Sequence, residues 1–101
     1  MHIEKNAGQL VATLQGELDH HTAADVREAL DEALTPDIQL LVLDLQALSF
    51  MDSSGIGVVL GRYKRMQAHG GSIQVRCTSR VAQILEMAGI FNIIERVEEI
   101  G

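Results

Sequence analysis

The sequence predicts an α/β fold, a single small domain with a mixed β-sheet that has a parallel centre and an N-terminal hairpin, packed by about three to four helices. Strand-like and helix-like segments alternate along the chain, as in crossover units. The aliphatic run "IQLLVLDL" (38–45) is typical of a strand inside a parallel sheet. The 101 residues contain no linker-like stretch, so we expect one domain, 1–101.

The N-terminal third predicts two strands and a helix. "HIEKNAGQLVATLQG" (2–16) is typical of two strands joined by a turn around Asn6–Gly8. A helix follows in "HTAADVREALDEALTPD", where Thr22 can be the N-cap and Asp25 the acid of a capping box. Pro36 then marks its end.

The remaining elements continue the alternation. They are a helix from Ser53 to about His69 ended by Gly70–Gly71, a strand at 72–77, a helix at 79–89 capped by Ser79 and ended by Gly89, and a closing strand within 90–101. On the first of these helices Ile56, Val59 and Tyr63 belong to an apolar stripe, and Arg62 lies mostly off it.

Composition and charge exclude several classes of function. The 8 basic and 14 acidic residues give a net charge of −6, whereas nucleic acids and anionic membranes attract a basic face. The single Cys77 cannot form an intramolecular disulfide and suits a reducing compartment. No apolar run approaches the roughly 20 residues that cross a bilayer, and the start has no signal-peptide pattern. We therefore expect a cytoplasmic protein that binds neither nucleic acid nor membrane.

The stretch "FMDSSGIGVVLGRYK" (50–64) lies at a strand–helix junction. Asp52, Ser53 or Ser54 would each be a favoured N-cap. Gly57 and Gly61 each cost up to about 1 kcal/mol relative to Ala in a helix, so we expect at least one of them to pack closely on the sheet.

Two catalytic or nucleotide-binding readings of the same stretch have little support. It contains no Walker A motif, and its glycines match a dinucleotide fingerprint imperfectly. A nucleophile elbow, G-x-S-x-G, is also missing. An esterase-like enzyme therefore rests only on the presence of Ser, His and Asp.

A second polar stretch, "GELDHHTA" (16–23), leads into the first helix, with Asp19 or Thr22 as its cap. Adjacent histidines make poor joint metal ligands and no spaced Cys or His completes a site, so we expect no metal ion and no cofactor. If the strands before the two stretches are neighbours, Asp19, His20 and Ser53 line one surface at the carboxyl ends of the strands. From the residues alone, the role of that surface stays open.

Taken together and in order, "GELDHHTA" and "LSFMDSSGIGVVLGRYK" resemble the anti-sigma factor antagonists of the STAS domain family (sulfate transporter and anti-sigma antagonist). The likeness extends over nearly the whole chain, including "GG" at 70–71 and "MAGIFNII" at 87–94. It implies a STAS-like domain that is not an enzyme. The unphosphorylated antagonist binds an anti-sigma factor that is also a serine kinase, a histidine-kinase-like ATPase, and so releases the sigma factor. The kinase phosphorylates the first serine of D-S-S-G, here Ser53, which ends binding, and a serine phosphatase restores it.

The resemblance also assigns a contact face. Its residues, carried over by motif, are Asp19, His20, Met51, Ser54, Gly55, Ile56, Gly57 and Arg62. We expect Ser53 at the cap position, where free backbone N–H groups and the helix dipole accommodate a phosphate. Family members usually carry a further helix after the last strand, which we expect to be short or absent here because the sequence ends in "RVEEIG". An alternative role is a STAS regulatory or scaffold module of a transporter or stress-signalling assembly.

Overall fold

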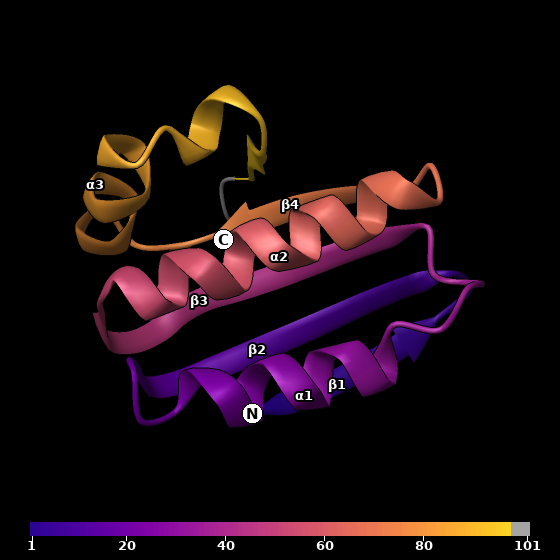
Figure 1. The fold of residues 1–101 in the computed structure, drawn as a ribbon, viewed down its shortest axis with the longest axis horizontal. Helices are drawn as coiled ribbons and strands as arrows, with labels where there is room; N and C mark the ends of the chain where they lie inside the picture. Colours follow the sequence, from indigo (N-terminus) through magenta and orange to yellow (C-terminus); the bar gives the residue numbers. More distant parts are fainter. Residues whose placement is uncertain (98–101) are drawn as a thin grey trace.

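The structure is a computed structural model that describes residues 1–97, and it confirms the predicted α/β class (Figure 1). Its elements are β1 (His2–Asn6), β2 (Gln9–Leu18), α1 (Ala23–Ala33), β3 (Leu40–Met51), α2 (Ser53–Ala68), β4 (Ser72–Arg76), α3 (Ser79–Met87), the 3₁₀ turn η1 (Ile90–Asn92) and β5 (Glu95–Arg96). The expectation of a short or absent C-terminal helix concerns residues 98–101, which lie outside the described part of the chain.

The sheet has the strand order β1-β2-β3-β4-β5. β1 pairs with β2 antiparallel, and the other neighbours are parallel, which confirms the mixed sheet with a parallel centre and an N-terminal hairpin. Ala7 and Gly8 join the hairpin strands with φ of 49° and 82°. A two-residue turn of this kind needs positive φ at both positions, because only then does its twist match that of the strands.

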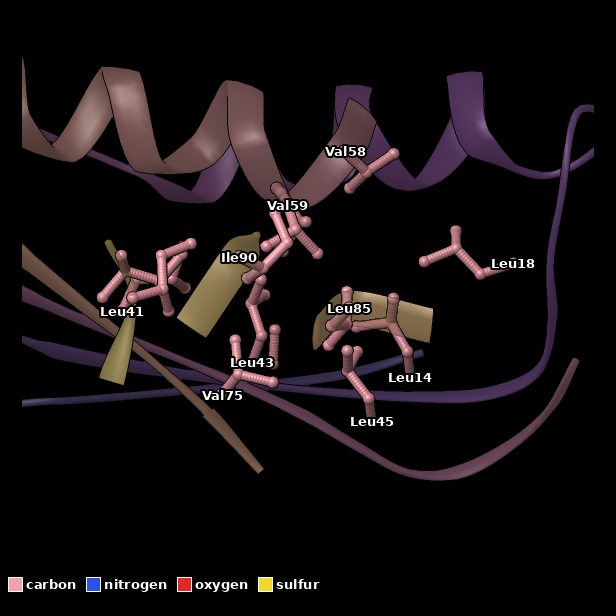
Figure 2. Close-up of a cluster of buried hydrophobic side chains, with 14 of the residues drawn as sticks. Leu14, Leu18, Leu41, Leu43, Leu45, Val58, Val59, Val75, Leu85 and Ile90 are labelled. Carbon is pink, nitrogen blue, oxygen red and sulfur yellow. The ribbon is translucent and has the colours of Figure 1, made fainter. Parts of the chain in front are cut away.

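The helices cover one face of the sheet. Each parallel crossover leads to the next strand in the same direction, so right-handed connections place all three helices on the same side. α1 contacts β2, and α2 contacts β3 and β4 (Figure 1). Figure 2 shows Val59 of α2 and Ile90 of η1 above Leu43 of the sheet, in one cluster with Leu85 of α3 and Leu14 of β2. The core between the two layers is aliphatic, as the composition predicts.

The predicted strand covered 38–45, whereas β3 begins at Leu40 and continues to Met51. The added half pairs with the end of β2, where Leu18 lies opposite Met51 after two register shifts. Its apolar pattern is irregular, since Leu48 and Met51 are buried while Phe50 is exposed. The extension matters for the site because it brings the end of β3 level with the end of β2.

One prediction near the C-terminus needs correction. The N-cap of α3 is Thr78 and not Ser79, because the Thr78 hydroxyl accepts a hydrogen bond from the Val81 amide at 3.4 Å. The predicted closing strand is present as Glu95–Arg96, only two residues long, and it follows η1. The other predicted helices hold: α1 ends before Pro36, and α2 ends just before His69.

Candidate functional site

The ends of β2 and β3 lie side by side and carry both polar motifs. The amide of Asp52 donates a hydrogen bond to the carbonyl of Leu18 at 3.2 Å. The loop after β2, which begins at Asp19, therefore lies next to the start of α2. This confirms that the two strands are neighbours and that their loops open on the same edge of the sheet.

Asp52 caps α2, and Ser53 is the first residue of the helix. The Asp52 backbone is extended, and its carboxylate Oδ1 accepts a hydrogen bond from the Ser54 amide at 2.8 Å. The expectation that Ser53 is the cap is therefore wrong. Ser53 is exposed, while Ser54 is half-buried.

The same cap limits the N–H groups that are free at this helix end. The Asp52 carbonyl accepts from the Gly55 amide at 3.0 Å, in addition to the bond between its carboxylate and the Ser54 amide. A helix starts with four amides that lack an intrahelical i−4 partner, and three of them, those of Asp52, Ser54 and Gly55, are bonded here. A phosphate on Ser53 would therefore compete with Asp52 for these donors.

Asp19 organises the loop between β2 and α1. Its carboxylate Oδ1 accepts from the amides of His21, at 2.8 Å, and Thr22, at 3.2 Å. Thr22 occupies the N-cap position, but its side chain makes no capping bond: its hydroxyl accepts from the Asp19 amide at 3.0 Å and donates to the carbonyl of Glu17 at 2.9 Å. The His21 hydrogen bond holds the pKa of Asp19 below its usual value, against the opposing effect of desolvation.

His20 links the two motifs. Its Nδ1 lies 3.7 Å from Oδ2 of Asp52, and its ring packs on that of His21 with the centroids 3.9 Å apart. Desolvation raises the pKa of Asp52, but the hydrogen bonds from Ser54 and His20 together hold it below its usual value. The face thus contains two carboxylates that stay ionised at neutral pH, with an exposed imidazole beside one of them.

Three of the expected contact residues support the face from below. Asp19 and Met51 are only 8% and 3% exposed, and Gly55 is buried. A Cβ on Gly55 would lie 2.6 Å from Cγ of Met51 and 3.1 Å from Cγ of Leu18, so only glycine lets α2 start this close to the strand ends. The accessible part of the face consists of His20, Ser53 and Gly57, with Ser54 and Ile56 half-buried.

The two helix glycines further along do not pack on the sheet. A Cβ on Gly57 or on Gly61 would meet no atom within 4 Å. The expectation that at least one of them lies against the sheet is therefore wrong. Gly57 is exposed on α2, one turn after Ser53. Glycine weakens a helix relative to alanine, and close packing does not explain why glycine stands here.

Arg62 does not lie on the accessible face. It is 6% exposed, and its Nε lies 3.1 Å from Oδ1 of Asp31 on α1. Arg65 approaches the same oxygen at 3.4 Å and donates to the carbonyl of Leu34 at the end of α1. Burial lowers the pKa of Arg62, and Asp31 opposes this change. Arg62 thus joins α1 to α2. It is buried, whereas the sequence predicted that it lies mostly off the apolar stripe of this helix.

Sequence reasoning missed Phe50 as a surface residue. Its side chain is 49% exposed on β3, two residues before Asp52. The sequence does place an aromatic residue between the polar Ser49 and the motif. Its exposure could not be predicted, because that requires knowing that the strand continues to Met51.

Within residues 1–97, no group of three or more His, Cys, Asp or Glu side chains is arranged to hold a metal ion. In the same part of the chain, no helix combines the length and the apolar character that a membrane span requires.

Comparisons with known proteins agree with the fold and the motifs. A family model described as "STAS domain" matches residues 1–100. The chain is 45% identical, over 94 residues, to the anti-sigma F factor antagonist of Paenibacillus polymyxa, covering 91% of this chain and 80% of that protein. The solved structure of unphosphorylated SpoIIAA, an anti-sigma factor antagonist, matches with a TM-score of 0.78 and 28% identity over 97% of this chain and 87% of that one. The phosphorylated form of Bacillus SpoIIAA matches with a TM-score of 0.76 and 28% identity over 97% and 91%.

Proposed function

Because this chain belongs to the STAS domain family, we propose that it is an anti-sigma factor antagonist that is switched by phosphorylation of Ser53. In its unphosphorylated form it binds an anti-sigma factor that is also a serine kinase, and the sigma factor is released. Phosphorylation ends this binding, and a serine phosphatase reverses the modification. Both events take place in the cytoplasm.

The observation that carries the proposal is the exposure of Ser53 on the first turn of α2, directly after the capping Asp52. The cap fixes the backbone of this turn, so the exposed Ser53 side chain projects from a fixed position on the chain. Gly57, also exposed, leaves the neighbouring surface without a side chain. Such a site suits a kinase active site that must approach the backbone closely. This chain is the substrate and not the enzyme, and the catalytic base and the magnesium ion belong to the kinase.

The charges around Ser53 support a switch that acts at the interface. A phosphoserine adds about −1.5 to −2 charges at neutral pH. Asp52 and Asp19, both with lowered pKa values, already supply negative charge there. Within residues 1–97 the one basic side chain paired with Asp52 is that of His20. Little positive charge on this chain therefore balances the negative charge of the phosphate. A partner surface that fits the serine hydroxyl would have to remove the water around the phosphate in order to bind.

The expected size of the switch follows from general interface energetics. Loss of a central contact in a protein interface costs about 2 kcal/mol or more, or about 30-fold in affinity. Helix α2 itself should survive, because negative charge at a helix N-terminus is favourable by about 0.3–1 kcal/mol. The phosphorylated chain is therefore folded and released.

The test uses the anti-sigma F factor of Paenibacillus polymyxa, the factor that the 45% identical relative is named for. With ATP and this factor, the intact mass should increase by one phosphate, and Ser53→Ala should abolish the increase. Ser54→Ala, the matched control, should still be modified. Ser53→Asp should keep the far-UV circular dichroism spectrum and lose binding. A phosphate found on Ser54 would contradict the assignment, and absence of both binding and modification would favour the regulatory or scaffold role.

A further inference from the structure

An apolar groove lies between the end of β3 and α3, outside the face formed by His20, Ser53 and Gly57. Its volume is about 140 Å³, and its lining residues are Ser49, Phe50, Met51, Arg80, Val81 and Ile84. A cavity of about 150 Å³ accepts a benzene ring, so the groove has room for one large apolar side chain. Phe50, which lines the groove, is 49% exposed. Exposed apolar side chains that gather beside a hollow mark interaction sites.

The groove is continuous with the phosphorylation site. Met51 forms part of its wall, and the same side chain lies against the position where Gly55 would carry a Cβ. Gly55 is in the first turn of α2, which begins at Ser53. Phe50 precedes Ser53 by three residues, which span at most about 11 Å of chain. A protein that covers Ser53 therefore reaches the groove as part of the same contact.

The charge beside the groove indicates the chemistry of its occupant. Arg80 lines the groove, is exposed, and has no ion-pair partner within residues 1–97. In a chain with a net charge of −6, this cation favours a partner that carries a carboxylate next to its apolar side chain. A second copy of this chain fits less well, because two acidic molecules repel each other.

We propose that this groove docks the anti-sigma factor that phosphorylates Ser53, by receiving an apolar side chain that is flanked by an acidic residue. This inference rests on the proposed function and adds a second anchor to it. The groove holds the kinase on the chain, while the chemistry takes place at Ser53. Loss of the anchor should therefore weaken binding without changing the phosphoryl-transfer step.

The experiment compares Phe50→Ala with Ile93→Ala. Ile93 is a matched control, because it is 48% exposed and lies beside β5, away from the groove. The Kd for the Paenibacillus polymyxa anti-sigma F factor and the KM and kcat of Ser53 phosphorylation are measured for each. Phe50→Ala should raise Kd and KM about tenfold and leave kcat within about twofold. Ile93→Ala should change none of them.

A charge variant gives an independent measure. Arg80→Glu lies on the exposed side of α3, so it should fold normally and raise KM, whereas Arg80→Gln should raise it less. Equal KM values for Phe50→Ala, Arg80→Glu and wild type would overturn the docking groove while leaving the function intact. A change in self-association with unchanged KM would assign the groove to a second copy and also overturn the proposal. If wild type is neither bound nor modified, the function and the groove fail together.

Discussion

Nδ1 of His20 lies 3.7 Å from Oδ2 of Asp52, so a side chain from the β2–α1 loop meets the residue that caps the helix of Ser53. The backbone bond from the Asp52 amide to the Leu18 carbonyl joins the same two segments. The two motifs, separated in sequence by a helix and a strand, therefore form one surface. A change in either loop is expected to affect how Ser53 is presented.

Asp52→Ala should loosen the first turn of α2. The Ser54 amide loses its acceptor, and the helix loses a favourable negative charge at its N-terminus. We expect a lower urea midpoint and slower phosphorylation of Ser53. Asp52→Asn keeps an oxygen acceptor and should retain most of the stability. If both variants unfold at the wild-type midpoint, the cap does not stabilise this helix.

Gly55→Ala should destabilise the chain by about 1–3 kcal/mol. The new Cβ would lie 2.6 Å from Cγ of Met51 and 3.1 Å from Leu18, both buried side chains that have little room to move. Urea denaturation monitored by circular dichroism measures the loss. A wild-type free energy of unfolding would mean that Met51 can turn aside.

Gly57→Ala and Gly61→Ala should act in the opposite direction. Neither new Cβ meets an atom within 4 Å, and Ala favours a helix by up to about 1 kcal/mol relative to Gly. Both variants should therefore unfold at higher urea concentrations. Only Gly57→Ala should weaken binding of the anti-sigma F factor, because Gly57 lies one turn from Ser53. Equal binding by the two variants would remove Gly57 from the contact face.

Arg62→Ala should lower the free energy of unfolding by about 2–3 kcal/mol, since it leaves Asp31 with Arg65 as its remaining partner and opens space between α1 and α2. Arg62→Met keeps most of the apolar stem and should cost less. A double-mutant cycle with Asp31→Asn measures the coupling of the pair. Binding of the anti-sigma factor per folded molecule should stay unchanged; a specific loss of binding would show that Arg62 does belong to the contact face.

Acid should remove the stability that Asp19 contributes. Because its folded-state pKa lies below the usual 3.8, the contribution is complete above that value and is lost as the pH falls through the lowered pKa. Asp19→Asn still accepts hydrogen bonds from the His21 and Thr22 amides but does not titrate. The difference in unfolding free energy between wild type and Asp19→Asn should be constant above about pH 5 and shrink below about pH 4. A difference that does not change from pH 7 to pH 3 would contradict the assigned pKa shift.

The sequence by itself determined the alternation of elements, the aliphatic core and the place of both motifs at strand ends. These features are local, because the apolar period of a segment such as 38–45 reports its secondary structure and the turn residues report its ends. The same reasoning predicted that Asp19, His20 and Ser53 share a surface if the strands before them are neighbours, and the pairing of β2 with β3 supplied that condition.

The tertiary structure decided what each residue of that surface does. Asp52 caps α2 through its own carboxylate, and the bond from its amide to the Leu18 carbonyl joins this helix start to the end of β2. Arg62 is buried because Asp31 faces it from another helix, and Gly55 must be glycine while Gly57 need not be, because Met51 lies under only one of them. Burial of charge and close approach depend on pairs of elements, and no pattern within one segment contains that information.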